Sequence, residues 1–263
     1  MPADSSDYVS TRIGRTTPDT ITVAGRDLPS EVMGRLSLTE LAYLLLADRE
    51  PTAGERRVLD ACLVSLADHG LTPSAMAARL THTGAPEAIQ ASVAAGLLGA
   101  GSVFLGPTGD TAEVLHSAIA EFGVDDLDHC AIHIVDRCID SGRRVPGLGH
   151  PIHRVEDPRT PRLYAIAEEE GLLGPHLDLL RRVAVIHEAA TGKCLPINGA
   201  GAAGAALVDV GVPPSVVRGF VLIARTAGLV AHLLEESQQP IGLPLWLELD
   251  ERASRSGSAE PPR

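Results

Sequence analysis

Histidine and arginine side chains concentrate in one short stretch, VPGLGHPIHRVEDPRTPRL (145–163), of a chain whose formal net charge is −12. Glycines just before His150 leave backbone N–H groups open to a ligand. The guanidinium forks of Arg154 and Arg159 match carboxylates and phosphates, and imidazole can donate or accept a proton near neutral pH. The stretch therefore predicts a site for a polycarboxylate, a phosphate ester, or both. A capping loop whose arginines pair with the abundant acidic residues is the structural alternative.

His69 is a second candidate, because it lies beside glycine at a break in the helical pattern, in the tetrapeptide ADHG. Taken alone, His69 and His150 are each as consistent with a structural role as with a functional one. Most of the ten histidines occur singly in predicted helices, where an ordinary surface or core position is expected. The sequence has no HExxH, CxxC or acidic calcium loop, so we predict no metal site.

The composition limits the kinds of partner. A chain of 263 residues that is 44% hydrophobic can bury a sizeable core. With 34 acidic against 22 basic residues, broad binding to nucleic acid or to an anionic membrane is not expected. The four cysteines suggest reduced thiols rather than a disulfide scaffold. The N-terminus lacks a signal-like apolar segment, and apolar runs are interrupted before reaching the length of a membrane span, so we expect a cytoplasmic protein.

The elements that must position these residues are almost all helical. Apolar residues recur at helical spacing in ten segments bounded by Gly, Pro, Asp or capping residues. The predicted helices are 38–48, 55–67, 73–81, 86–100, 110–122, 126–141, 160–170, 175–191, 199–210 and 214–235. Residues 19–29 alternate like a pair of strands around Ala24-Gly25. The C-terminal ERASRSGSAEPPR (251–263) has the composition of a disordered tail.

Five blocks, in order, give the chain a family resemblance that covers nearly its whole length. They are TRIGRTTPDTITVAGRDLPSEVMGRLSLTELAYLLLADREPT, LADHGLTPSAMAARLTHTGA, GSVFLGP, RRVPGLGHPIHRVEDPR and VLIARTAGLVAHLLEE. Together they resemble the citrate synthase superfamily, and within it the citryl-CoA lyases and the C-terminal module of ATP-citrate lyase. The resemblance implies an all-α fold, with a large helical domain (1–107 and 211–263) and a smaller one (108–210) closing over the site of a homodimer.

The resemblance also implies roles for individual residues. The catalytic His150 would bind the oxygen that is a hydroxyl in citryl-CoA and a carbonyl in oxaloacetate. His69, Arg159 and Arg225 would hold the carboxylates of a di- or tricarboxylate substrate. Coenzyme A, as part of an acyl-CoA substrate or product, would contact Arg154 and the backbone from Gly147 to Gly149.

Three departures from the family pattern bear on the chemistry. The GPLHG stretch, whose histidine helps the synthases to stabilise an enol, reads GPTGD (106–110) here, which favours cleavage over condensation. The NVDG stretch reads NGAG (198–201), so Ala200 stands where the family has its catalytic aspartate. Gln239 stands where many lyases have an arginine before PIG.

Two hypotheses follow. The first is a citryl-CoA lyase-like enzyme, acting on citryl-CoA or a related 3-hydroxyacyl-CoA, in which Asp110 or a water carries the proton. The second is a catalytically silent relative that binds acyl-CoA or acts as a partner or regulatory subunit. Retention of five polar site residues favours the first hypothesis, and the loss of the aspartate favours the second.

Overall fold

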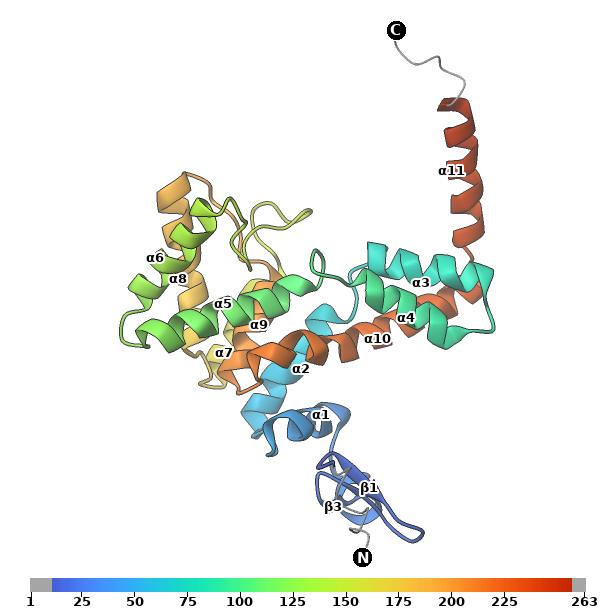
Figure 1. Ribbon diagram of the computed structural model, residues 1–263, viewed down its shortest axis with the longest axis horizontal. Helices are drawn as coiled ribbons and strands as arrows, with labels where there is room; N and C mark the ends of the chain where they lie inside the picture. The colour runs from blue at the N-terminus through green and yellow to red at the C-terminus, as the bar shows by residue number, and fades with distance from the viewer. Residues whose placement is uncertain (1–10, 257–263) are drawn as a thin grey trace, which may run out of the picture.

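The computed structural model describes residues 11–256, which form a helical body with a small sheet at its N-terminal end (Figure 1). The helices are α1 (Leu38–Ala47), α2 (Ala53–Ala67), α3 (Pro73–Gly84), α4 (Ile89–Gly99), α5 (Gly106–Phe122), α6 (Leu127–Asp140), α7 (Arg159–Glu169), α8 (Pro175–Thr191), α9 (Gly199–Asp209), α10 (Pro214–Gln238) and α11 (Gly242–Ser256). The predicted all-α fold is confirmed, and each of the ten predicted helices is present; α8 has the predicted bounds, and the ends of the others differ by a few residues.

Local signals explain where these helices begin. Ser37 and Glu40 form a complete capping box at the start of α1, and Thr52 and Glu55 form another at the start of α2. Proline occupies the first turn of α3, α5, α8 and α10, where its missing N–H costs no helical hydrogen bond.

The core lies around α9, which packs against α2, α5, α7 and α8 (Figure 1). Nine of the eleven residues of α9 are buried, and most are glycine or alanine. Small side chains let the neighbouring helices approach closely, which suits a chain with only 3% aromatic residues. The long helix α10 packs against α2 and α5 with one part, and against α3 and α4 with another. The division into domains 1–107 with 211–263 and 108–210 stays a prediction.

The N-terminal sheet is slightly larger than predicted. Strands β2 (Ile21–Val23) and β3 (Arg26–Asp27) pair antiparallel across Ala24-Gly25, as expected, and β1 (Gly14–Thr16) pairs with the other edge of β2. Both turn residues have positive φ, 48° at Ala24 and 76° at Gly25. A short π-helix, η2 (Leu28–Val32), follows the sheet and was not predicted.

The prediction of a disordered tail over 251–263 is wrong for residues 251–256, which form the second half of α11. Residues 257–263 lie outside the described residues. The charged composition of this segment also suits a helix, because Arg252 pairs with Glu248 and Arg255 with Glu251 one turn apart. Helix α11 extends away from the body, and its start lies against α3 and the end of α10 (Figure 1).

Among the described helices, α10 alone is long and apolar enough to cross a membrane by length and composition. No apolar segment of this length was predicted from the sequence. However, α10 buries charged Arg225 and Glu236 against its neighbours and contributes Phe220 and Leu229 to the core. These contacts are those of a core helix in a folded chain.

Candidate active site

The glycine-rich loop before His150 is held against the start of α9. The amide of Gly149 donates to the carbonyl of Pro196 at 2.7 Å, and the amide of Asn198 donates to the carbonyl of Gly147 at 2.9 Å. The side-chain amide of Asn198 donates to the carbonyl of Gly149 at 2.8 Å. Two segments about fifty residues apart in sequence therefore form one rigid platform.

Three histidine rings meet above this platform. The ring centroids of His69 and His150 lie 5.3 Å apart, those of His150 and His153 lie 4.5 Å apart, and those of His69 and His153 lie 5.7 Å apart. All three side chains are half-buried, and one ring nitrogen of each lies within 4.8 Å of the others. This grouping could also be drawn together around a divalent cation, which the sequence analysis did not expect.

The hydrogen bonds of His150 fix its tautomer. Its Nδ1 atom accepts the backbone amides of Ile152 and His153, both at 3.1 Å. Nδ1 must therefore be unprotonated, so the ring proton lies on Nε2. Burial, and next the neighbouring His153, lower the pKa of His150, which favours the neutral ring. His150 is therefore a hydrogen-bond donor at Nε2.

Arg159 is held by a buried carboxylate. Its Nε and Nη2 atoms donate to the two oxygens of Asp157 at 2.9 and 2.7 Å, and Asp157 is fully buried. The amide of Gly199, at the start of α9, donates to the same carboxylate at 2.7 Å. Burial alone raises the pKa of Asp157, but the hydrogen bonds from Arg159 and Gly199 outweigh it and hold the pKa well below its usual range. Asp157 thus orients Arg159 and ties it to α9.

Three buried nitrogen atoms at the site have no hydrogen-bond partner among the described residues. The Nε and Nη1 atoms of Arg225 and the Nε2 atom of His69 are buried and have no hydrogen-bond partner. The nearest acidic oxygen to Arg225 is on Asp68, 4.0 Å away. Burial and next the charge of Arg159 lower the pKa of His69, and burial also lowers that of Arg225. Buried donors without partners are costly, and a carboxylate would satisfy them.

A chain of polar contacts runs from Asp68 through α3 and α10 to the start of α11. His232 donates from Nε2 to Asp68 at 2.8 Å and receives the Nε–H of Arg79 at Nδ1, 3.1 Å away. Arg79 also pairs with buried Glu236 at 3.0 Å. Glu236 accepts the amide of Gly242, the first residue of α11, at 2.7 Å. The segment that carries His69 is thereby linked to the start of α11.

The structure brings four of the predicted residues together: His69, His150, Arg159 and Arg225. Predicted Gly147 and Gly149 lie in the platform beneath them, and Arg154 is exposed on the loop that follows His150. Asp110, proposed as a proton carrier, is exposed on α5 and makes no hydrogen bond or ion pair to the cluster among the described residues.

Three kinds of site residue were not predicted from the sequence. His153 was part of the opening motif and received no role, although its spacing from His150 brings the two rings together. Asp157 was noted only as part of DPR. The sequence gives no local pattern for the supporting contacts, because these contacts join three helices and a loop. They involve Asp68, Arg79, His232 and Glu236, which lie in two of the blocks that carry the family resemblance.

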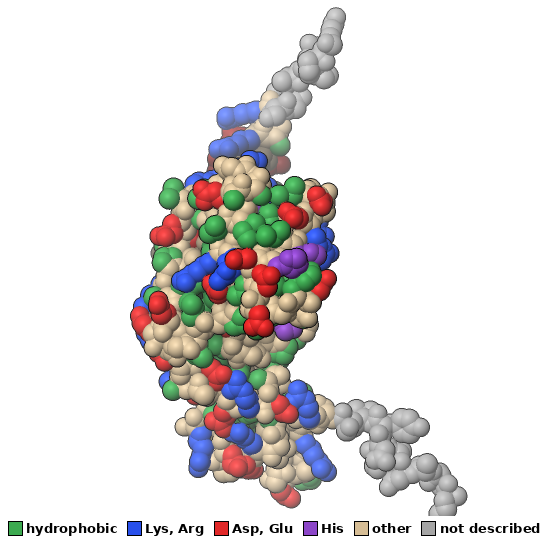
Figure 2. All heavy atoms as spheres, turned by 90° about the vertical axis from the view of Figure 1, so that its left-hand side faces the viewer, with side chains coloured by type: hydrophobic (Ala, Val, Ile, Leu, Met, Phe, Trp, Pro, Cys, Tyr) green, Lys and Arg blue, Asp and Glu red, His purple; other side chains and the backbone are tan. Residues whose placement is uncertain are grey.

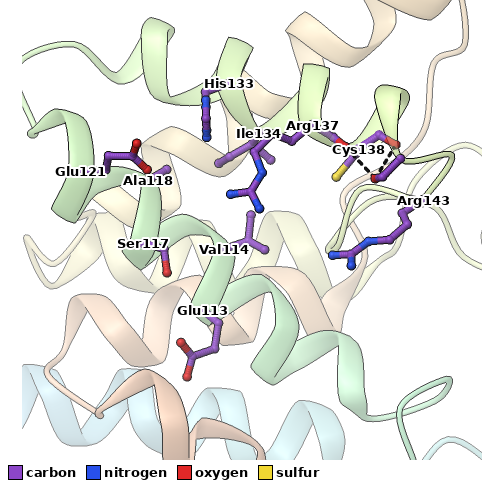
Figure 3. A pocket seen from close by; sticks show the side chains of 11 residues that line it. Glu113, Val114, Ser117, Ala118, Glu121, His133, Ile134, Arg137, Cys138 and Arg143 are labelled. Carbon is purple, nitrogen blue, oxygen red and sulfur yellow. Dashed lines mark hydrogen bonds between the residues drawn. The ribbon is translucent and has the colours of Figure 1, made fainter.

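A separate cavity of about 330 Å³ lies between α5 and α6 (Figure 3). It is lined by Val114, Ala118, Ile134 and Cys138, with Arg137, Arg143, Glu113 and Glu121 among its polar residues. None of the predicted site residues lines it. The face around α6 and α8 carries acidic, basic and apolar side chains intermixed (Figure 2). This face therefore has no continuous basic surface for a polyanion.

Comparisons with known proteins agree on one family. The family model "Citrate synthase, C-terminal domain" matches residues 12–244. Citryl-CoA lyase from Hydrogenobacter thermophilus has a structure with TM-score 0.78 and 32% identity, covering 87% of each chain. A mutant of ATP citrate lyase from Methanosaeta concilii, in complex with (3S)-citryl-CoA, has TM-score 0.73 and 21% identity, covering 88% of this chain and 39% of that one.

A curated relative, "Putative citrate synthase 2" of Mycobacterium tuberculosis, is 28% identical over 221 residues, which are 80% of this chain and 56% of the relative. The chain thus spans about half the length of the curated relatives it matches. It matches the citryl-CoA lyase over most of both lengths.

Proposed function

Because the chain belongs to the citrate synthase family, we propose that it is a lyase that cleaves citryl-CoA, or a related 3-hydroxyacyl-CoA, to acetyl-CoA and oxaloacetate. The observation that carries this proposal is the set of buried, unpaired donors on His69 and Arg225 beside the neutral His150. Such donors suit a substrate with more than one carboxylate and a nearby hydroxyl. The similarity to a citryl-CoA lyase supports the same substrate.

Each residue has a task in this reaction. Arg225 and His69 would bind one carboxylate. Arg159, oriented by Asp157 and by the carbonyl of Ser65, would bind another through its remaining N–H groups. His150 would donate from Nε2 to the oxygen of the reacting carbon. As the hydroxyl proton leaves, the negative charge that develops on that oxygen would be stabilised by this donor and by the nearby guanidinium groups. When the carbon–carbon bond then breaks, the oxygen becomes the carbonyl of oxaloacetate and the electron pair passes to the acetyl side.

Coenzyme A would lie along the loop from Gly147 to Arg154. The loop presents backbone next to His150, and the exposed guanidinium of Arg154 can pair with a phosphate. We also propose that the protein is a homodimer and acts in the cytoplasm, as expected from the family resemblance and the composition.

A second candidate function is a silent member that binds acyl-CoA without cleaving it. Ala200 favours it, because a methyl group in the first turn of α9 cannot transfer a proton. General acid–base groups contribute roughly 10²–10⁴-fold to rate, so their absence would reduce turnover severely.

One experiment separates the two functions. Purified protein is mixed with citryl-CoA, and oxaloacetate is followed by a coupled reductase. Release of oxaloacetate at enzymatic turnover supports the lyase; a thermal shift with citryl-CoA but no release supports the silent binder. Neither release nor shift would reject both.

Binding of coenzyme A has its own test. Millimolar CoA should raise the melting temperature, since a ligand that binds only the folded state stabilises it. Arg154→Ala should reduce this shift. Arg35→Ala, at an exposed arginine near the N-terminal sheet, is the matched control and should keep it. Absence of a shift in the unmodified protein would count against acyl-CoA binding.

A further inference from the structure

Cleavage of citryl-CoA requires two proton movements. The hydroxyl proton leaves as the oxygen becomes a carbonyl, and the bond between the hydroxyl carbon and the acetyl carbon breaks. Its electron pair stays on the acetyl side as an enolate, which then takes up one proton at carbon. One proton leaves and one is added, so a single group that accepts the first and returns it balances the reaction.

His150 is not suited to be that group. Both of its amide contacts are to Nδ1, at 3.1 Å each, and hold the ring proton on Nε2. To accept the hydroxyl proton at Nε2, the neutral ring would first have to lose the proton it already carries there. His150 therefore stabilises the oxygen as a donor, and another group takes the proton.

The carboxylates near the site already accept hydrogen bonds on both oxygens. Asp157 accepts Arg159 on both oxygens, and the amide of Gly199 as well. Asp68 accepts His232 on one oxygen and the amide of Gly70 on the other, each at 2.8 Å. Ala200 supplies none. Burial raises the pKa values of Asp68 and Asp157, but these hydrogen bonds outweigh it and hold both values below their usual range, so both carboxylates are poor acceptors for the hydroxyl proton.

His69 is also poorly placed for this task. Its unpaired Nε2 is buried, and burial, then the charge of Arg159 and, to a smaller extent, that of Arg225 lower the pKa of the ring. A second proton on this ring would add a third positive charge to the same pocket. As a neutral donor to a carboxylate, the same ring relieves that charge.

His153 is the remaining titratable ring, and its nitrogens have no hydrogen-bond partner among the described residues. The ring stacks on His150 at 27° with centroids 4.5 Å apart, and it is half-buried. We infer that His153 is the proton carrier of this enzyme: it takes the hydroxyl proton and returns it to the acetyl carbon, in place of the aspartate that Ala200 replaces. This inference rests on the proposed lyase function.

The test compares His153→Gln with His116→Gln. His116 stacks on His176 with centroids 5.6 Å apart at 14°, outside the site, so it controls for loss of a stacked imidazole. We expect His153→Gln to lower kcat for citryl-CoA at least 100-fold with little change in KM, and to remove one limb of the pH–rate profile. We expect His116→Gln to stay within twofold of the unmodified protein.

The second part of the test places a carboxylate at position 200, where the family pattern has its aspartate. Ala200→Asp in the His153→Gln background should recover at least tenfold in kcat, because the aspartate then carries the proton. A merely structural role for His153 predicts no such rescue. The inference is overturned if His153→Gln keeps kcat within threefold, if the pH profile is unchanged, if Ala200→Asp gives no rescue, or if EDTA abolishes activity of the unmodified protein.

A proton-exchange readout separates failure of this inference from failure of the proposed function. The protein is incubated in D₂O with acetyl-CoA and malate, a dicarboxylate without a reactive carbonyl, and deuterium in the acetyl methyl group is measured. Exchange that depends on His153 without citryl-CoA cleavage would support the proton carrier and reject the lyase. Cleavage with exchange that is independent of His153 would reject the carrier alone, and absence of both cleavage and exchange would reject both.

Discussion

The guanidinium of Arg159 lies directly against the Cα of Gly199. A Cβ atom added at Gly199 would be 2.5 Å from Nε and 2.7 Å from Cζ of Arg159. The family pattern NVDG has valine at this position, so the glycine and the neighbouring Ala200 are adjacent departures. The room left by the glycine is occupied by the arginine that we propose binds a substrate carboxylate.

Gly199→Ala should therefore weaken substrate binding. The added methyl group forces Arg159 away from Asp157, and we expect at least a tenfold loss of citrate affinity in a calorimetric titration. Gly219→Ala in α10 is the matched control, because no heavy atom lies within 4 Å of its added Cβ. The control should bind normally and gain up to about 1 kcal/mol of stability from helix propensity. Unchanged citrate affinity in Gly199→Ala would contradict the assigned role of Arg159.

The lowered pKa of Asp157 predicts how stability changes with pH. A carboxyl whose pKa is lower in the folded state stabilises the fold above its unfolded pKa of about 3.9, and this contribution is lost as pH falls toward the folded value. Asp157→Asn should cost about 3 kcal/mol at neutral pH, since it leaves a mostly buried guanidinium unpaired.

Urea unfolding of both proteins between pH 8 and pH 3 would measure this. The difference in unfolding free energy should be constant above about pH 5 and should shrink below pH 4, because Asp157 is then protonated in the unfolded state while it stays ionised in the folded protein. Asp125→Asn, at an exposed turn, is the control and should show a small difference throughout. A difference for Asp157→Asn that persists unchanged to pH 3 would argue against the lowered pKa.

Helix α11 carries an exposed apolar face through which we expect the protein to self-associate. Leu243, Trp246 and Leu247 lie on one side of the helix at i, i+3 and i+4, and each is about half exposed or more. Such an apolar face suggests a partner, and a second copy of the chain is the one that the family resemblance implies. We expect light scattering to give twice the 27.5 kDa of one chain.

Trp246→Asp should shift this equilibrium to the monomer. Val124→Asp, an exposed apolar residue in the turn between α5 and α6, tests whether any added surface charge has the same effect. If the unmodified protein is already a monomer at micromolar concentration, α11 has another role.

The helices were predictable because their signals are local. Helix α8 has the predicted bounds, 175–191, since Pro175 opens it and Gly192, with φ of 69°, closes it. Helix α11 was missed because composition alone was used for its second half, and charged residues at i and i+4 suit a helix as well as a disordered tail.

The site was predictable only in part, for a physical reason. His69 and His150 are 81 positions apart, and residues at that separation meet only through the packing of several helices. Residue chemistry and the family resemblance identified both. The tautomer of His150 and the stacking of His153 depend on how the loop turns back at Ile152, which no pattern in the sequence encodes.

The buried charge of Arg225 has opposite effects on ligand binding and on the stability of the fold. Its guanidinium is buried, two of its nitrogens have no partner, and the nearest carboxylate oxygen is 4.0 Å away. Burying a charge that is poorly compensated costs several kcal/mol. Arg225→Met keeps most of the volume and removes the charge, so the melting temperature without ligand should rise by a few degrees. The stabilisation by millimolar citrate should disappear in the same variant.

Arg79→Met is the matched control for this change. Arg79 is equally buried, but it is paired with Glu236 and His232. Removing it leaves the buried carboxylate of Glu236 with the amides of Ile241 and Gly242 but without the guanidinium, so the same substitution should destabilise the fold by about 3–5 kcal/mol. Opposite signs for the two variants in a thermal scan would show that Arg225 is held ready for an anion. If Arg225→Met is destabilised as strongly as Arg79→Met and still responds to citrate, the guanidinium is a structural element and the carboxylate site lies elsewhere.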